Sequence, residues 1–495
     1  MSTTITSTGT LIDEAVFGGK IFIDGEWVEG QGGTAPSLEP ATGETLATVG
    51  IAGPADVTRA AEGAARAQRE WAATPHPARA AVLRRAGQLW EQYAEEIGGW
   101  NTREVGAIPP LAGFALHVTA AECYEASALP SAPLGSILSS EEPRLSLAQQ
   151  IPVGVVGVIS PFNVPLILGI RAVAPALALG NAVILKPDPR TVVTGGVSMV
   201  RIFEEAGLPK GLLQLVPGGA DVGEAMVADP RVRVIAFTGS TRAGRIVGEL
   251  AGRHLKRAHL ELGGNSAFII REDADVAQAV NLATWGSFLH QGQICMTVGR
   301  HIVHESIFES YVSALAEKAE SMHVGDPAAG PVHLGPLIDE VQRDRVHTLV
   351  QDAVAQGAEL RAGGTYEDLF YRPTVLANTP KDAAAYCDEV FGPVASVVSY
   401  STDDEAVALA SDTEYGLSLG IVTRDVLGGL AMAQRIPTGI VHINDQTVND
   451  EANAPFGGTG ASGTGSRHGG AQASIDAFTE TRWITMRREP GQYPL

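Results

Sequence analysis

The sequence predicts an α/β protein with two parallel-sheet domains, and three observations support this. Between residues 153 and 270, short runs rich in β-branched residues alternate with helix-like segments, which is the pattern of βαβ units. After residue 272 the alternation resumes, with helix-like runs at 276–289 and 306–319 around a strand-like run at 301–303. The 495 residues also exceed what one hydrophobic core usually holds. A second α/β domain is therefore expected after the first.

The N-terminal part predicts a hairpin and then helices. An Asp-Gly pair at residues 24–25 separates two apolar runs, which is typical of a tight two-residue turn. Residues 56–71 and 78–100 are rich in alanine, carry apolar residues at helical spacing, and each follow a proline. We expect both helices to pack across a sheet.

The middle of the chain supplies the strands and crossover helices of the first sheet. The strand-like runs lie at residues 153–159, 182–185, 213–216, 234–237 and 267–270. Residues 192–206 and 220–228 suit crossover helices that cover the sheet on both faces. Such units bind nucleotides at the carboxyl ends of their strands, so a nucleotide site is expected here.

Composition limits the partners and the location. The formal net charge of −21 repels nucleic acid and anionic lipid. The N-terminus lacks a basic start followed by an apolar run, so we expect a cytoplasmic protein. The apolar stretch 151–185 contains Arg171, Asn163 and several prolines, which indicates buried core rather than a membrane span. The three cysteines show no metal-type pairing and fit a reducing compartment, so we expect no metal.

Two literal motif matches fail on context. Residues 416–420 (GLSLG) match the nucleophile elbow of serine hydrolases, but the residues that follow continue as a strand rather than a helix. Residues 458–463 (GTGASG) match GxGxxG, but no strand precedes them. We interpret the first as a loop entering a strand and the second as a flexible loop.

A better nucleotide candidate is FTGSTRAGR at residues 237–245, because a strand leads into it and a helix follows. Its small residues let backbone N–H groups approach a pyrophosphate. A plain strand-to-helix turn is an equally open interpretation of this segment taken alone.

Three residues from distant parts of the sequence form a candidate catalytic set. Cys295 lies where glycine and polar residues break a helical pattern, which could expose a reactive thiol. Glu261 is flanked by leucines, and burial would raise its pKa toward that of a useful base. Asn163 lies in a proline-braced turn and could donate to an oxyanion. The alternatives are an inert buried cysteine, a salt-bridged glutamate and an ordinary turn asparagine.

Taken together, seven segments resemble the aldehyde dehydrogenase superfamily over about residues 21–483. They are SPFNVPL from Ser160, GNAVILKPD from Gly180, FTGSTRAGR from Phe237, LELGGN from Leu260, GQIC ending at Cys295, EVFGPV from Glu389 and PFGG from Pro455. The segments HQGQICM, KPDPRT and NDQTVNDEANAPFGG are similar to the benzaldehyde, vanillin and salicylaldehyde dehydrogenase branch. An aromatic aldehyde is therefore the expected substrate.

The resemblance implies a mechanism through a covalent thioester. Cys295 is then the nucleophile, Glu261 the base that activates water, and Asn163 with the Cys295 backbone N–H the oxyanion hole. Release of the acid by water implies a non-acylating enzyme. The open alternatives are an acylating or aliphatic semialdehyde dehydrogenase, or a catalytically silent structural relative.

The resemblance also implies NAD or NADP as the cofactor. The expected contacts are Ser160, Pro161, Phe162, Lys186, Gly239, Ser240, Leu262, Gly263, Glu389 and Phe391. Among these, Lys186 is expected at the adenosine ribose, Gly239 and Ser240 near the pyrophosphate, Glu389 at the nicotinamide ribose and Phe391 near its ring.

One departure from the family pattern leaves the choice between the two cofactors open. Pro189 stands where the family often has a glutamate that binds the ribose hydroxyls. Arg190 or Arg242 could accommodate a phosphate, although we favour NAD.

The expected substrate pocket is apolar, which suits an aromatic ring. Its candidates are Phe162, Val164, Leu168, Arg171, Ile294, Met296 and Phe456, each of which could instead be ordinary core. Arg171 could meet a ring hydroxyl or pair with an acid.

The family-like domain organisation is discontinuous. Residues 1–128 with 151–258 are expected to bind the nucleotide, 259–445 to form the catalytic domain, and 446–469 to form an active-site loop region. Residues 129–150 with 470–495 are expected to form an oligomerisation element, which implies a homodimer or homotetramer.

Overall fold

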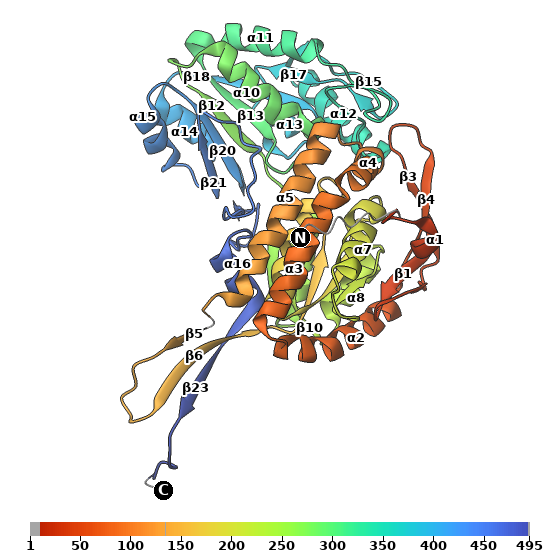
Figure 1. Cartoon of the computed structure of the whole chain (residues 1–495). Helices are drawn as coiled ribbons and strands as arrows, with labels where there is room; N and C mark the ends of the chain where they lie inside the picture. The colour runs from red at the N-terminus through yellow and green to blue at the C-terminus, as the bar shows by residue number, and fades with distance from the viewer. Residues whose placement is uncertain (1–9, 134, 494–495) are drawn as a thin grey trace, which may run out of the picture.

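The computed structural model describes residues 10–133 and 135–493 and contains two seven-stranded sheets (Figure 1). The first sheet has the order β11-β10-β7-β8-β9-β1-β2. Its strands are β1 Lys20–Ile23, β2 Glu26–Glu29, β7 Val155–Ile159, β8 Ala182–Lys186, β9 Leu213–Leu215, β10 Val232–Thr238 and β11 Arg257–Glu261. The five strands from β7 to β11 are parallel, whereas β1 and β2 form an antiparallel hairpin. Positive φ at Asp24 and Gly25 forms the hairpin turn that the sequence predicts.

Helices cover the first sheet as the periodicity predicts, with one difference. They are α2 Pro54–Ala73, α3 His76–Gln92, α4 Ala94–Val105, α5 Pro109–Ala128, α6 Pro165–Ala178, α7 Ser198–Glu205, α8 Ala220–Ala228 and α9 Thr241–Arg253. The single helix predicted at residues 78–100 is wrong, because Tyr93 leaves the helical conformation with ψ near 18° and separates α3 from α4. The Tyr93 hydroxyl donates to Glu205 at the end of α7, which ties this junction to the layer beneath.

The second sheet has the order β14-β17-β18-β13-β12-β20-β21. Its strands are β12 Ser266–Ile270, β13 Val298–His304, β14 Glu359–Ala362, β17 Thr374–Ala377, β18 Val394–Tyr400, β20 Ser418–Val422 and β21 Ile440–Ile443. All neighbours are parallel except β14 and β17. Its helices are α10 Val276–Phe288, α11 Phe308–Glu320, α12 Glu340–Ala355, α13 Ala384–Cys387, α14 Asp403–Ser411 and α15 Val426–Ala433. This confirms the second α/β unit.

Smaller elements complete the chain. They are α1 Glu14–Phe17, β3 Thr34–Leu38, β4 Thr45–Gly50, β15 Tyr366–Glu367, β16 Phe370–Tyr371, β19 Tyr415–Gly416, β22 Thr459–Gly460 and α16 Ala471–Phe478. Residues 416–420 run from β19 into β20, so the interpretation as a loop entering a strand is confirmed. Residues 458–463 are no free loop: β22 pairs with β19, and the Ser462 carbonyl accepts from Leu262 N. The strand at residues 266–270 belongs to the second sheet. Strand β11 belongs wholly to the first sheet, although it spans the boundary between the nucleotide-binding and catalytic domains that the sequence predicts at residues 258–259.

Each sheet contains a point where the strand order reverses between parallel neighbours, and these points differ in their chemistry. In the first sheet the reversal lies between β7 and β10, so Ser160 and Gly239 meet at the carboxyl ends of these strands. Open α/β sheets bind ligands at such a crevice. In the second sheet one reversal lies between β12 and β20.

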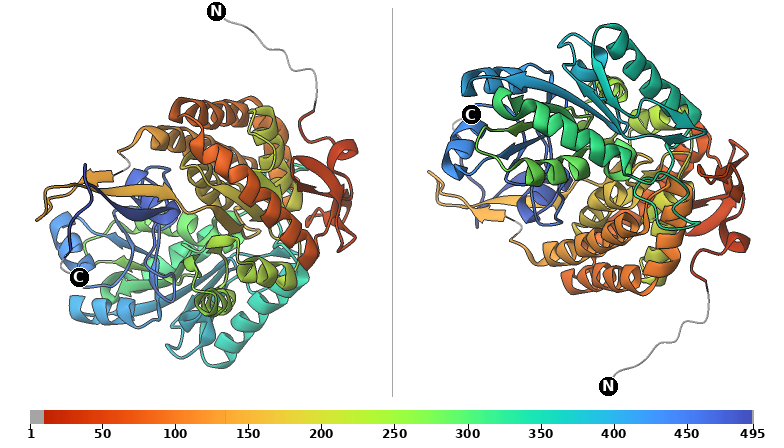
Figure 2. Two further views of the ribbon diagram at one scale, coloured as in Figure 1. Left: turned by 90° about the horizontal axis from the view of Figure 1, so that it is seen from below. Right: turned by 90° about the horizontal axis from the view of Figure 1, so that it is seen from above.

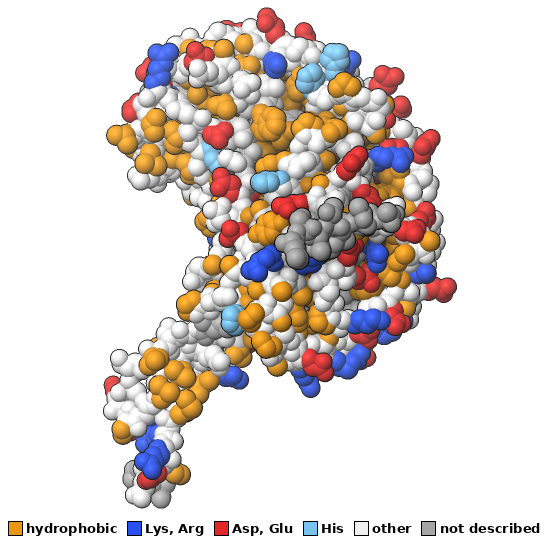
Figure 3. All heavy atoms as spheres, in the orientation of Figure 1, with side chains coloured by type: hydrophobic (Ala, Val, Ile, Leu, Met, Phe, Trp, Pro, Cys, Tyr) orange, Lys and Arg blue, Asp and Glu red, His pale blue; other side chains and the backbone are white. Residues whose placement is uncertain are grey.

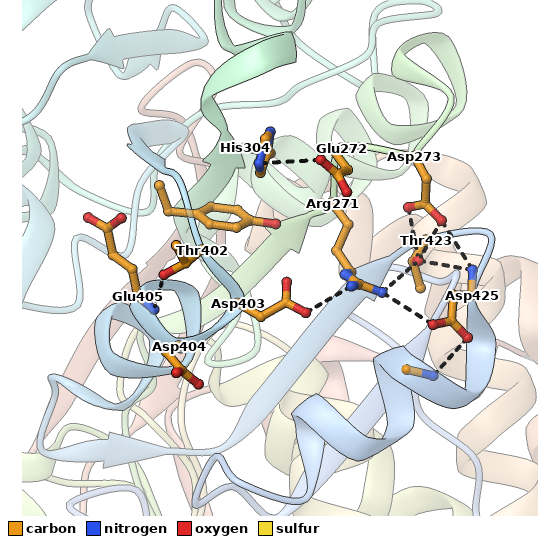
Figure 4. A network of polar contacts seen from close by, with 12 residues as sticks. Arg271, Glu272, Asp273, His304, Thr402, Asp403, Asp404, Glu405, Thr423 and Asp425 are labelled. Atoms are coloured by element: carbon orange, nitrogen blue, oxygen red, sulfur yellow. Dashed lines mark hydrogen bonds and ion pairs between the residues drawn. The ribbon is translucent and has the colours of Figure 1, made fainter.

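The corresponding edge of the second sheet is closed by a polar network (Figure 4). Arg271 pairs there with Asp403 at 2.8 Å, and the Asp273 carboxylate accepts from the Thr423 hydroxyl and from backbone N–H groups beside it. These groups satisfy one another, so the first sheet supplies the open crevice.

A third, antiparallel sheet projects from the molecule (Figures 1 and 2). It contains β5 Gly135–Ile137, β6 Leu145–Pro152 and β23 Thr479–Met486, and β6 pairs with β23 along its full length. Segments more than 300 residues apart are thus brought side by side. Within the residues described, no helix is long and apolar enough to cross a membrane.

Candidate active site

Cys295 lies where the two main sheets meet. It follows the turn Leu289–Gly292 and precedes β13, whereas Asn163 follows β7 of the first sheet. Both residues line one cavity of about 410 Å³. The cavity is therefore built by the carboxyl end of one sheet and the amino end of the other.

Six of the seven predicted pocket residues line this cavity. They are Val164, Leu168, Arg171, Ile294, Met296 and Phe456. Sequence reasoning missed further lining residues from other parts of the chain: Pro110, Leu111, Phe114, Ile167, Trp285, Leu289, Asp445, Gln446, Val448, Asn449 and Asp450. Those on α5 and α10 carry ordinary helical periodicity, so no local signal marks them as pocket residues.

Phe162 is the exception and does not line the cavity. Its ring packs edge-on against Phe391 at a centroid distance of 5.9 Å and lies under the Arg190 guanidinium at 4.1 Å. The structure therefore does not place Phe162 in the cavity that the other six candidates line. Asn163 lines the cavity, whereas its neighbour Phe162 packs against Phe391, which is one of the cofactor candidates.

Arg171 is buried and pairs with acids. Its guanidinium lies 2.5 Å from Asp450 and 3.4 Å from Glu122, and it stacks over the Phe456 ring at 4.6 Å. Burial raises the pKa of Glu122 to about 7, although the Arg171 charge opposes the rise. Of the two sequence-based possibilities for Arg171, pairing with an acid is the one observed. Its Nη1 is buried without a hydrogen-bond partner.

The Asn163 amide, which lines the same cavity as Cys295, is fixed by a hydrogen bond. Its Nδ2 donates to the Gln293 carbonyl at 2.7 Å, two residues before Cys295. Burial raises the pKa of the Cys295 thiol well above its usual range, and the carboxylates of Glu389 and Glu261 raise it further. The resting sulfur is thus a neutral thiol that needs a proton acceptor in order to attack.

Glu261 ends β11 and is only 3% exposed. Burial raises its pKa to about 8, against the opposing charges of Arg171 and Arg467. A Cβ at Gly457 would come within 2.8 Å of its Oε1, so the glycine leaves room for this carboxylate. A carboxyl group with such a pKa can accept a proton near neutral pH and release it again.

The residues expected to bind the cofactor gather at the carboxyl edge of the first sheet. Lys186 ends β8 and is buried, and Ser240 caps α9 by accepting from Ala243 N. Gly239 joins β10 to Ser240, while Ser160 and Pro161 follow β7. The buried Ser160 hydroxyl has no partner. A thirteen-residue helix beginning at a strand-order reversal fits a pyrophosphate.

The second domain contributes Glu389 and Phe391. Gly264 N donates to the Glu389 carboxylate at 2.9 Å, and burial raises the pKa of this carboxyl to about 7. Helix α12 holds the backbone of the segment, because Arg345 donates to the Glu389 carbonyl at 2.6 Å and Gln342 to that of Phe391 at 2.9 Å. Leu262 packs against α9, and a Cβ at Gly263 would meet Glu389. The donor set therefore fits a dinucleotide across the two domains.

The Arg190 guanidinium is already paired with two aspartates. It binds Asp188 through Nε and Nη2 at 2.9 and 2.8 Å, and Asp339 through Nη1 at 2.7 Å. Lys186 lies near the carboxylates of Asp188 and Asp221, which act on its pKa against the lowering effect of burial. Arg242 is exposed. The idea that Arg190 accommodates a phosphate is thus not supported, and the surroundings of Lys186 are acidic.

The fold and the site are those of an α/β enzyme with a candidate dinucleotide crevice and a cavity that contains a thiol. Comparison with known proteins gives the family. The aldehyde dehydrogenase family model matches residues 27–484, and the chain belongs to this family of NAD(P)-dependent enzymes that oxidise aldehydes to acids.

The similar proteins include enzymes named for aromatic aldehydes. The chain is 62% identical to a vanillin dehydrogenase of Amycolatopsis sp., covering 98% of this chain and all of that one. It is 48% identical to the benzaldehyde dehydrogenase [NAD(+)] of Pseudomonas putida, covering 97% and 99%.

Two solved structures extend the comparison. A salicylaldehyde dehydrogenase from Pseudomonas putida G7, complexed with salicylaldehyde, is 35% identical with a TM-score of 0.93 and covers 96% of this chain and 99% of that one. A betaine aldehyde dehydrogenase of Staphylococcus aureus in complex with NAD+ is 29% identical, also with a TM-score of 0.93, over 97% and 96%.

Proposed function

We propose that this chain oxidises an aromatic aldehyde to the carboxylic acid with NAD, through a thioester on Cys295. The observation that carries the proposal is the cavity: an apolar chamber of about 410 Å³ with the Cys295 thiol and the Asn163 amide in its wall. Leu168, Met296 and Phe456 offer apolar contact to a ring. The names of the vanillin and benzaldehyde dehydrogenases similar to it support this substrate class.

The first half-reaction forms the thioester. The Cys295 sulfur bonds to the aldehyde carbon as its proton passes to solvent, so this step does not require Glu261. The carbonyl oxygen becomes an oxyanion, which accepts from the second Nδ2 hydrogen of Asn163 and from the Cys295 backbone N–H. NAD supplies the acceptor for the hydride that leaves this carbon when the carbonyl re-forms.

The second half-reaction frees the acid. Ionised Glu261 removes a proton from water, the hydroxyl adds to the thioester carbon, and the same donors stabilise the second oxyanion. Collapse breaks the C–S bond, so the carboxylic acid leaves and the sulfur regains a proton. Water is the acceptor in this scheme, which makes the enzyme non-acylating.

NAD is the proposed cofactor over NADP. The pair Asp188 and Asp221 near Lys186 would repel a 2′-phosphate, and Arg190 is neutralised by two aspartates. In this proposal Lys186 and Glu389 bind the two riboses, Gly239 and Ser240 the pyrophosphate, and Phe391 the nicotinamide side.

The experiment follows reduction of NAD and of NADP by absorbance with benzaldehyde, vanillin and a short aliphatic aldehyde, with and without coenzyme A. The expected result is the highest kcat/KM with an aromatic aldehyde and NAD, unchanged by coenzyme A. A higher kcat/KM for the aliphatic aldehyde would replace the proposal with an aliphatic aldehyde dehydrogenase, and dependence on coenzyme A would make it acylating.

We further propose that residues 129–150 and 470–495 join copies of the chain into a homodimer or homotetramer. The projecting sheet exposes large apolar side chains, visible as a patch in Figure 3. They include Ile137 at 78% exposed, Trp483 at 64% and Met486 at 49%. Such a patch is typical of an interface. A cytoplasmic location is also proposed, supported by the free state of Cys123, Cys295 and Cys387.

A further inference from the structure

A left-handed turn precedes Cys295. Three consecutive residues, His290, Gln291 and Gly292, have φ of +53°, +58° and +67°. Only the third is a glycine, and side-chain-bearing residues adopt this conformation at a cost. Strained backbone of this kind persists only where its surroundings hold it, and it gathers at functional sites. The contacts that hold this turn therefore need an explanation.

Two glutamines tie the turn to the rest of the second domain and to the α4–α5 connection. Gln291 Nε2 donates to the carbonyls of Gly106 at 3.2 Å and Pro336 at 2.8 Å. Gln293 Oε1 accepts from Ile338 N at 3.1 Å. Both side chains are at most 1% exposed, so these bonds do not compete with water.

His290 makes a different contact, to the first domain. Its Nε2 lies 2.8 Å from the Asn163 carbonyl oxygen, and the ring is fully buried. Because a carbonyl only accepts, Nε2 must carry the hydrogen, which leaves Nδ1 as the bare nitrogen of a neutral ring. Nδ1 is buried without a partner. Burial lowers the pKa of this histidine to about 4, so the ring stays neutral at working pH.

Two hydrogen bonds from this one turn therefore hold Asn163. His290 binds its backbone carbonyl, and the Gln293 carbonyl accepts from its side-chain Nδ2 at 2.7 Å. The same turn leads directly into Cys295. The position of the amide relative to the sulfur thus depends on this turn, although Asn163 and Cys295 come from different domains.

We propose that His290 is a positioning residue for the oxyanion hole: its Nε2–H holds the Asn163 backbone so that the free Nδ2 hydrogen points at the oxyanion formed on Cys295. This inference rests on the proposed function, because it assigns His290 to the same reaction. His290 is not among the residues that line the substrate cavity. Its effect reaches the chemistry only through Asn163.

The test is a double-mutant cycle between His290→Ala and Asn163→Ala, measured as kcat/KM for the best aldehyde found for the wild type. Removal of one oxyanion donor costs about a hundred- to a thousandfold in kcat. We expect His290→Ala to lose about ten- to a hundredfold by misplacing that donor, with KM for NAD unchanged. In the Asn163→Ala background the same substitution should lose less than about threefold, since the donor is already absent.

Two conservative variants separate the hydrogen bond from the backbone strain. His290→Gln carries an N–H at the reach of Nε2 and should recover most of the kcat/KM lost by His290→Ala. His290→Asn suits a left-handed backbone but places its amide at the reach of Nδ1, so it should stay impaired. If His290→Asn were as active as His290→Gln, the assignment of the hydrogen bond to Nε2 would be overturned. If His290→Ala lost the same factor of kcat/KM in the wild type and in Asn163→Ala, the route through Asn163 would be overturned.

Controls keep a folding defect and a failed function apart from a failed inference. His301 is also fully buried, bonded to Ser287 and Tyr311, and His301→Gln should leave kcat/KM per folded enzyme unchanged. The rate of Cys295 alkylation by iodoacetamide should be equal in wild type and His290→Gln. Absence of aldehyde oxidation by the wild type would refute the proposed function itself, whereas a full-rate, folded His290→Ala would refute only the role of His290.

Discussion

Hydrolysis of the thioester should follow the ionisation of Glu261. With a pKa of about 8, the ionised fraction of this carboxyl is about 1% at pH 6, about a tenth at pH 7 and about half at pH 8. The raised pKa keeps the group protonated at neutral pH, and only the ionised form removes a proton from water. The rate of hydrolysis should therefore rise about tenfold from pH 6 to pH 7 and level off above pH 8.

The assay is stopped-flow NADH absorbance, in which a burst reports thioester formation and the steady phase reports hydrolysis. Glu261→Gln should keep the burst of NADH that accompanies thioester formation on each Cys295 thiol, while the rate of the steady phase falls by at least about a hundredfold. Intact mass should then show the acyl adduct. Glu104→Gln, which removes another fully buried carboxyl with a raised pKa, should keep the wild-type profile.

Attack by hydroxide is the competing explanation for a rise with pH. Its rate would continue to climb above pH 9 and would climb equally in Glu261→Gln, whereas titration of a base gives a plateau that the variant lacks. A steady phase that is flat between pH 6 and pH 9, or that survives in Glu261→Gln, would refute the assignment of the base.

Four further predictions address the nucleophile, the cavity wall, the cofactor and the assembly. Cys295→Ala should abolish NADH formation in the burst and in the steady phase, while calorimetry should show that NAD still binds. Turnover at the wild-type rate would refute the assignment of Cys295 as the nucleophile. Arg171→Met should destabilise the fold by about 3–5 kcal/mol, since it strands two buried carboxylates, and a thermal melt equal to wild type would contradict this. Lys186→Met should raise KM for NAD about tenfold with little change in kcat, because the ribose contact is lost without touching the reacting atoms; unchanged KM counts against the contact. Ile137→Asp should lower the mass measured by light scattering, whereas Val341→Asp, equally exposed at 79%, should not; equal behaviour of the two would argue against the projecting sheet as the interface.

Most elements of the fold could be predicted because their signals are local. Alternating β-rich and helical runs gave the strands and crossovers near their observed bounds, and the Asp24-Gly25 pair gave its hairpin. The break at Tyr93 was missed, since residues 78–100 keep one helical period and the bend depends on a hydroxyl contact with Glu205, 112 residues away. Local periodicity contains no information on such partners.

The candidate site was also predictable only in part. The sequence singled out Glu261 and Asn163 as polar residues among apolar neighbours, and Cys295 as a thiol where glycine and polar residues interrupt a helical pattern. The lining of the cavity could not be derived from the sequence in this way. Phe162 and Asn163 are adjacent in sequence, yet Asn163 lines the cavity whereas Phe162 packs against Phe391. Which of these contacts each residue makes depends on how the second domain packs against the turn after β7.

By itself the sequence determined the class of fold, the family resemblance and the candidate reactive side chains, since these depend on spacing and residue type. Only the tertiary structure decided the partners. Arg171 meets Asp450 across 279 residues, and His290 meets Asn163 across 127. The physical reason is that two separately encoded sheets bring these groups together when they pack, and burial then fixes both their hydrogen bonds and their pKa values.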